Sequence, residues 1–65
     1  MTKNQIKVIA QITEETGSFI SCRQIPMFFV TAYCFQTAKS IVKDMFKGQN
    51  ISGGLMDIKG NLENF

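Results

Sequence analysis

A helical repeat of apolar residues dominates the middle of the chain and organises what lies on either side. Over residues 34–48 the apolar positions recur at spacings of three and four, as on one side of an amphipathic helix. They are Phe35, Ala38, Ile41, Val42, Met45 and Phe46. Gly48 is well suited to close this helix, whereas Cys34 is a poor residue to cap its start. Such a helix is not stable alone, so we expect it to cover a sheet.

A period of two precedes the helix and predicts strands. Four apolar residues alternate with mostly polar ones, namely Ile6, Val8, Ala10 and Ile12. Ile9 is the one exception in this strand, whose alternation is typical of one face packed on a core. Residues 14–17 predict a hairpin loop, with Gly17 at positive φ. A second strand should begin at residue 18, with a bulge or break at Pro26, which lacks an N–H for the ladder. Residues 27–33 are aromatic and β-branched and predict a strand buried on at least one face.

Loop and turn residues follow the predicted helix. Residues 49–54 have the composition of a loop, and residues 55–59 predict a short strand. Gly60 and Asn61 indicate a turn, after which residues 62–65 return as a brief edge strand. The order is ββαββ. It predicts an α+β fold in which an antiparallel sheet of four to five short strands is covered by one amphipathic helix.

Size and composition favour one small folded domain over residues 1–65. The chain is 45% apolar and 18% charged, which is too hydrophobic for a disordered polypeptide. So many apolar residues in so small a domain also predict exposed apolar surface, used in a homodimer or in docking on a larger partner. The longest apolar stretch is about ten residues, short of the roughly twenty that span a bilayer. We therefore expect a soluble protein of the cytoplasm.

Few residues have the chemistry of a catalytic or metal site. The chain has no histidine, and its five acidic residues are scattered. Glu14 and Glu15 are expected to be solvated in a turn, and Gly53 and Gly54 to serve a loop that needs positive φ rather than to hold a phosphate. We predict no enzyme activity, no metal and no cofactor.

The two cysteines, Cys22 and Cys34, lack the spacing of a zinc or redox motif and predict reduced, buried thiols. A disulfide between them is the alternative in an oxidising compartment. Cys34, beside a helix N-terminus, is the better candidate for a reactive thiol.

Lysines on the predicted helix are the clearest polar pattern. Lys39, Lys43 and Lys47 are spaced by four and would form one row on the exposed face. This row indicates either a solvated face or a surface that meets phosphates or acidic side chains. A net charge of +2 argues against a dedicated duplex-DNA binder.

Aromatic residues in the predicted strand over residues 27–33 form a second candidate surface. Alternate residues there must point to the face that the helix leaves open, so either Phe28 or Phe29 is expected to be exposed, where it could stack on bases. Arg23 is a further candidate for contact with a partner.

The run from Phe29 to Gly60 resembles small phage-encoded anti-CRISPR proteins of type I-F, in which a single helix packs on a curved antiparallel sheet. The matching positions are Val30, Ala32, Phe35, Ala38, Lys39 and Ile41. The family places a basic pair on its helix, whereas here Lys39 is followed by Ser40. The resemblance implies a phage inhibitor that docks in the host cytoplasm on a CRISPR surveillance complex and uses Lys39 and neighbouring lysines where nucleic acid would otherwise lie.

The expected function is therefore that of a non-enzymatic inhibitor that binds a larger protein or ribonucleoprotein complex and blocks its binding of nucleic acid. One alternative is a small single-stranded nucleic-acid-binding protein that uses the aromatic face and the lysines. Another is a small accessory or structural protein whose exposed apolar residues form a homodimer interface.

Overall fold

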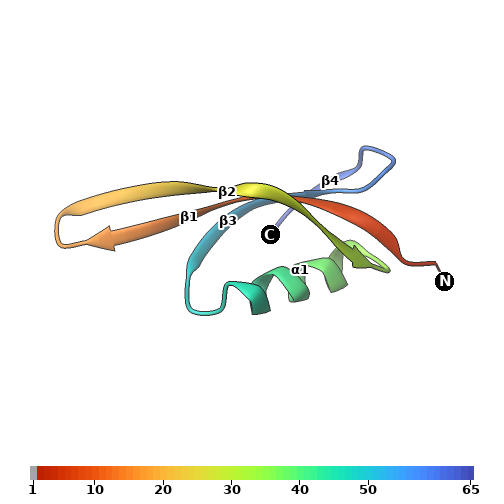
Figure 1. Ribbon diagram of the computed structural model, residues 1–65, viewed down its shortest axis with the longest axis horizontal. Helices are drawn as coiled ribbons and strands as arrows, with labels where there is room; N and C mark the ends of the chain where they lie inside the picture. The colour runs from red at the N-terminus through yellow and green to blue at the C-terminus, as the bar shows by residue number, and fades with distance from the viewer. Residues whose placement is uncertain (1) are drawn as a thin grey trace.

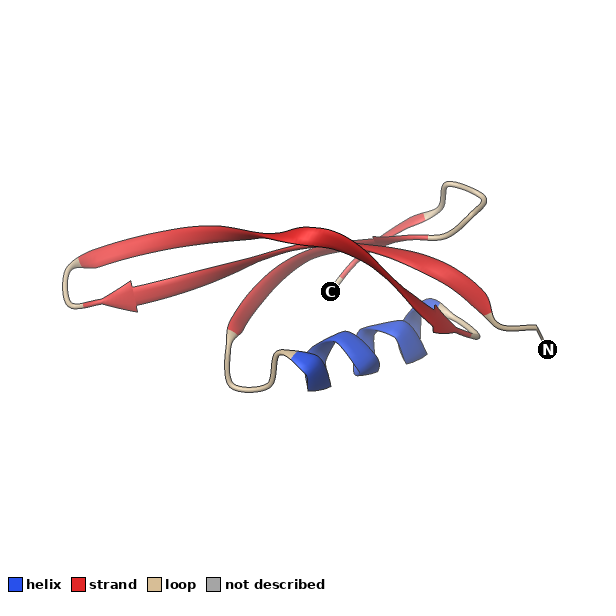
Figure 2. Ribbon diagram, viewed as in Figure 1, coloured by secondary structure: helices blue, strands red, loops and turns tan. Residues whose placement is uncertain are grey.

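Two long antiparallel strands run the length of the molecule and carry the other elements. The computed structural model describes residues 2–65 (Figure 1). Its elements in chain order are β1 (Asn4–Thr16), β2 (Phe19–Ala32), α1 (Phe35–Met45), β3 (Asn50–Met56) and β4 (Leu62–Asn64). The four strands pair antiparallel in the order β2-β1-β3-β4, and α1 lies beneath one face of this sheet (Figure 2). The predicted α+β fold with one helix on an antiparallel sheet is confirmed.

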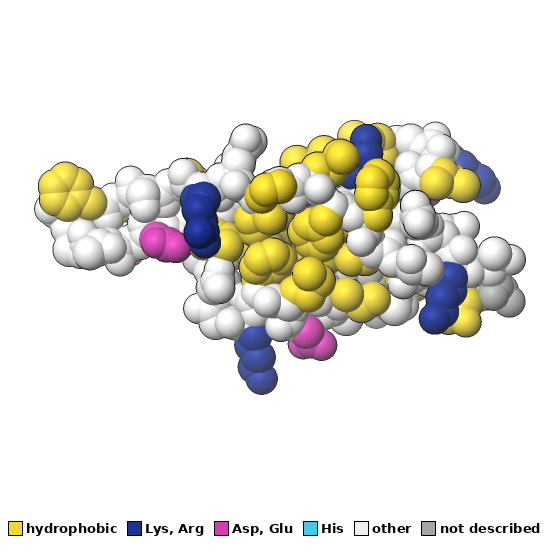
Figure 3. Space-filling model, viewed as in Figure 1, with side chains coloured by type: hydrophobic (Ala, Val, Ile, Leu, Met, Phe, Trp, Pro, Cys, Tyr) yellow, Lys and Arg dark blue, Asp and Glu magenta, His cyan; other side chains and the backbone are white. Residues whose placement is uncertain are grey.

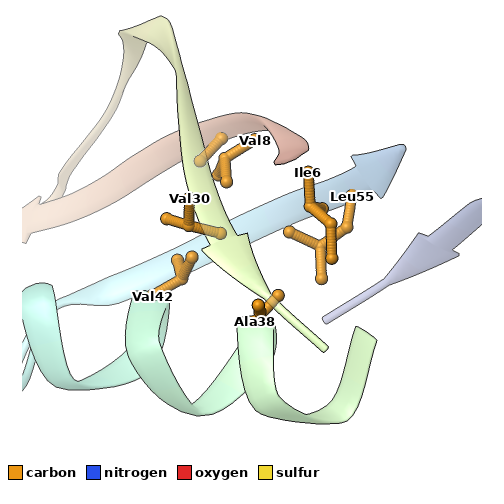
Figure 4. Packing of buried hydrophobic residues seen from close by; sticks show 8 residues of the cluster. Ile6, Val8, Val30, Ala38, Val42 and Leu55 are labelled. Carbon is orange, nitrogen blue, oxygen red and sulfur yellow. The ribbon is translucent and has the colours of Figure 1, made fainter. Parts of the chain in front are cut away.

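The core lies between α1 and the sheet face that it covers. Even-numbered residues of β1 point into this layer, as the alternation predicted, and Val8 has no exposed surface. Ala38 and Val42 of the helix pack against these β1 residues, and Leu55 of β3 belongs to the same cluster (Figure 4). Each large apolar side chain buried in this way stabilises the fold by about 1.5–3 kcal/mol. The cluster comprises Ile6, Val8, Ala10, Val30, Ala32, Ala38, Val42 and Leu55.

A β-bulge interrupts the pairing of β1 with β2 where proline predicted it. Val8 pairs with Phe28, but Ala10 pairs with Ile25, so β2 has one extra residue at this point. Pro26 falls inside the irregularity, where its missing N–H costs the ladder least. The strand nevertheless continues through the bulge, so one long strand replaces the two segments considered from the sequence.

The β1–β2 hairpin is longer than predicted and extends beyond the rest of the sheet as an arm (Figure 1). The expectation that residues 14–17 form a loop is wrong for the first three of them, because Glu14, Glu15 and Thr16 pair with β2. Only Gly17 and Ser18 make the turn, and Gly17 has the predicted positive φ of 61°. Polar residues are compatible with strand structure here because no core covers the arm.

The segment after the helix is also a strand where a loop was predicted. Residues 49–54 were expected to be irregular, but β3 begins at Asn50 and pairs along β1. Gly53 has a φ of 142°, and a Cβ at this position would overlap the carbonyl oxygen of Ile9. Glycine is therefore needed for two backbones to approach closely within a sheet, so its presence does not indicate a loop. The strand ends at Met56, before the predicted end at residue 59.

The helix is shorter than the predicted 34–48. It begins at Phe35 and ends at Met45, and Gly48 closes the following turn with a φ of 83°. Cys34 occupies the N-cap position with an extended backbone and makes no side-chain capping hydrogen bond, as its chemistry predicted. Met45 departs from the predicted apolar stripe, because 55% of it is exposed.

Candidate functional site

The two candidate phenylalanines point to opposite sides of the sheet. Phe28 pairs with the buried Val8 and shares its face, and its ring centroid lies 6.2 Å from that of Phe46 beyond α1. Phe29 pairs with Lys7 on the face that the helix leaves uncovered, and 51% of it is exposed. Phe28 thus packs against the core and stays partly exposed, whereas Phe29 is the more exposed of the two.

The candidate lysines on the helix differ in their surroundings. Lys39 is half-buried, and its Nζ lies 3.3 Å from a carboxylate oxygen of Glu63 in β4. Lys43 is exposed in the last turn of α1, and Lys47 is exposed beyond the helix end. The predicted row therefore contains one lysine engaged within the protein and two with free access to solvent. All three belong to the helical layer, on the other side of the sheet from Phe29.

Arg23 lies on the arm, where Nη2 is 3.8 Å from Oε1 of Glu14. Both side chains are mostly exposed, at 68% and 60%, so water screens this pair and it adds little to stability. The guanidinium remains accessible to a partner.

Both cysteines are exposed, so the expectation of buried thiols is wrong. Cys22 lies on the arm, which has no core to bury it, and its Sγ is 3.3 Å from the hydroxyl of Thr13. Cys34 lies at the start of α1, with Sγ 3.4 Å from the hydroxyl of Thr37. That hydroxyl lowers the pKa of the Cys34 thiol, and the nearby backbone N–H groups of Thr37 and Gln36 lower it further. The two thiols are free and form no disulfide.

The uncovered sheet face presents an apolar surface that is larger than the aromatic residues predicted for it. Lys7 lies within it, between Phe29 on one neighbouring strand and Met56 on the other. An open hollow of about 390 Å³ beside Lys7 is lined by these residues and by Ile58. The exposed apolar residues of this face and its rim are Ile9, Ile20, Met27, Phe29, Ile58 and Leu62. Ile9 was the one break in the β1 alternation, and that break was the available signal in the sequence.

A second apolar surface follows the free edge of β2. Within the described sheet this strand pairs only with β1, so half of its backbone polar groups face outward. Positions 39 and 41 of a helix point in roughly opposite directions. Because Lys39 reaches β4, Ile41 lies on the flank of α1 toward β2, together with the exposed Met45. Figure 3, viewed from the β2 edge, shows hydrophobic side chains gathered from the sheet down to the helix.

Among residues 2–65, no three His, Cys, Asp or Glu side chains gather in a geometry that could hold a metal ion. In the same part of the chain, no helix has the length and apolar character needed to cross a membrane. Comparison with protein-family models, curated proteins and solved structures finds no match.

Proposed function

We propose that this protein is a non-enzymatic docking protein that receives an extended segment of a larger protein along the free edge of β2. The observation that carries the proposal is the apolar strip beside that edge, formed by Phe28, Ile41 and the 55% exposed Met45. An added strand gains main-chain hydrogen bonds from β2 and buries its inward side chains against this strip. The bulge at Pro26 limits the continuous edge to the part of β2 beyond it, residues 27–32.

The first target to test is a type I-F CRISPR surveillance complex, because the chain resembles small inhibitors of that system. Docking there would block the binding of target DNA. The exposed Lys43 and Lys47 lie in the helical layer, with Lys43 on the flank of α1 opposite Met45, and would face acidic or phosphate groups beside the edge contact. Lys39 contributes less than the resemblance implies, because Glu63 already neutralises it.

The experiment titrates a purified type I-F surveillance complex with the protein and measures binding of labelled target DNA. We expect inhibition at a stoichiometric ratio. Met45→Glu should weaken it at least about tenfold, since the charge meets an apolar contact, while circular dichroism stays unchanged. Lys43→Glu should weaken it less if the edge is the main contact. Full inhibition by Met45→Glu would exclude the edge, and neither inhibition nor association by the unaltered protein would exclude this target.

Single-stranded nucleic acid is the second candidate partner, favoured by one observation. Lys7 and Phe29 are cross-strand neighbours on the open face, which places a cation beside an exposed aromatic ring. Such a pair can hold a phosphate and stack a base. Binding to a labelled oligonucleotide should then fall steeply with salt and weaken in Phe29→Ala. Absence of binding at low salt would eliminate this candidate.

A further inference from the structure

The strands place two charged side chains on the uncovered sheet face, and these have opposite signs. On β1 the odd-numbered residues point to this face, because their even-numbered neighbours are buried against the helix. Among them only Lys7 and Glu15 are charged, and the β2, β3 and β4 residues that share the face in register are uncharged. Neither Lys7 nor Glu15 forms an ion pair with another residue of the described chain.

These two charges are symmetric about the middle of the strand. Lys7 and Glu15 lie four residues to either side of Gln11, or about 13 Å each way. Gln11 pairs with Gln24 on one side and with Ser52 on the other, so a row of uncharged polar residues crosses the sheet at the midpoint. A two-fold axis along this row would place Lys7 of one copy opposite Glu15 of a second copy, and would do so twice.

The apolar residues of the face obey the same symmetry. Ile20 pairs with Glu15 and Phe29 pairs with Lys7, so the two-fold that joins the charges also brings Ile20 of one copy onto Phe29 of the other. Ile20 is 71% exposed and Phe29 is 51% exposed, and Ile9 and Met27 between them are also about half exposed. Glutamines near the axis meet their own counterparts, and an amide both donates and accepts hydrogen bonds.

We propose that the uncovered face is a self-complementary interface on which two copies of this chain pack sheet against sheet, related by a two-fold axis at Gln11. About 100 Å² from each of four apolar side chains, together with the polar residues between them, gives on the order of 600–800 Å² per copy, near the size of a standard interface. Sheets that pack face to face lie about 10 Å apart, a gap that lysine and glutamate can span. Dimer formation buries apolar surface that would otherwise remain exposed to solvent.

The dimer leaves the β2 edge and the helical layer of each copy open. Docking along the β2 edge and self-association on the sheet face therefore use different residues, and each can fail without the other. Met45 and Lys43 serve the first test, whereas Lys7 and Glu15 serve the second.

Charge reversal and mixing test the pairing directly. Sedimentation equilibrium of the unaltered protein should show a monomer–dimer transition between micromolar and millimolar concentration. Lys7→Glu and Glu15→Lys should each weaken the dimer by about tenfold or more, because each sets like charges opposite one another twice. An equimolar mixture of the two variants should restore association as a heterodimer, visible by native mass spectrometry, since both contacts then join opposite charges.

Two control variants separate the contact from net charge. Lys43→Glu changes the charge as Lys7→Glu does but lies in the helical layer, and Glu14→Lys matches Glu15→Lys but points to the other side of the arm. Both should dimerise as the unaltered protein does. A protein that is monomeric at millimolar concentration, a dimer insensitive to both reversals, or a mixture that does not restore association would each overturn the proposal.

Discussion

At Gly53 the backbone of β3 lies so near β1 that no other residue type fits there. A Cβ would overlap the Ile9 carbonyl oxygen and lie 2.8 Å from Cα of Ala10, and the φ of 142° is strained for any L residue. Gly53→Ala should lower the free energy of unfolding by about 3 kcal/mol, measured by urea denaturation. Gly48→Ala is the matched control, because its φ is also positive but its surroundings are open, and it should cost about 1 kcal/mol. Equal losses in the two variants would show that the close approach is not the cause.

Cys34 has the environment of a reactive thiol. Its pKa lies below the ordinary value of 9.0, chiefly because the Thr37 hydroxyl hydrogen-bonds to the sulfur, and reagents can reach it. In a Cys22→Ser background, the rate of alkylation should rise with pH with a midpoint below 9.0, because the thiolate is the nucleophile. Thr37→Val should move this midpoint upward. A midpoint unchanged by that substitution would contradict the role of the hydroxyl.

At the scale of elements, the turn between β3 and β4 is held by one carboxylate. Oδ1 of Asp57 accepts hydrogen bonds from the backbone N–H groups of Lys59 and Asn61, each at 2.9 Å, and Oδ2 accepts one from the Asn61 amide. The Asn61 side chain is the largest cause of the lowered pKa of Asp57, and the backbone donors add to it. Backbone hydrogen bonds from Asp57 N–H to the Asn61 carbonyl and from Gly60 N–H to the Asp57 carbonyl also close this turn, in which Gly60 has a φ of 89°.

A carboxyl whose pKa is lowered by folding stabilises the native state when it is ionised. This contribution is present above the ordinary pKa of 3.8 and is lost as the pH falls through the lower pKa of the folded state. Asp57→Asn should therefore be less stable than the unaltered protein at neutral pH, and the difference should shrink as the solution is acidified below 3.8. Urea denaturation across this range measures it. A difference that is constant with pH would show that charge on Asp57 is not involved.

Elements with a clear hydrophobic period were predictable, and those shaped by contacts between backbones were not. The stripe containing Ala38 and Val42 placed the helix, and the even-numbered residues of β1 placed the core, because burial imposes those periods. The first part of β3 was missed because Gly53 has the composition of a loop residue, and only its closeness to β1 explains why glycine is there. The end of the arm was missed because Glu15 lies in a ribbon without a core, where strand pairing leaves no hydrophobic signal.

For the candidate surfaces, too, a spacing along the chain was predictable, whereas contacts between different strands and the helix were not. A lysine spacing of four was visible in the sequence, but the ion pair that engages Lys39 depends on where β4 brings Glu63. The alternation of β2 could not decide between Phe28 and Phe29, because the bulge at Pro26 shifts its register. Lys7 lies within an apolar surface because β2 and β3 pair with β1 on either side of it. The sequence alone does not show this pairing.

At the scale of the whole molecule, the arm makes the protein elongated. Its extents are 47 × 20 × 16 Å and its radius of gyration is 12.9 Å, whereas a compact chain of this length would have about 11 Å. Every residue of the arm beyond Thr13 is exposed, so the arm buries almost nothing against the core. An isolated two-stranded ribbon is marginally stable, and we therefore expect the arm to contribute little to the stability of the fold.

Shortening the arm tests this division between a core that holds the fold and an arm that serves association. Glu14 and Ser21 are register partners of the same hydrogen-bonded kind as Thr16 and Phe19, which flank the present turn, so an Asn-Gly turn can replace residues 15–20 without shifting the strands. The free energy of unfolding should change by less than about 1 kcal/mol, because no core contact is lost. The dimer should disappear, since Glu15 and Ile20 are removed with the arm. A loss of several kcal/mol would mean that the arm supports the fold, and a shortened protein that still dimerises would place the contact between copies elsewhere.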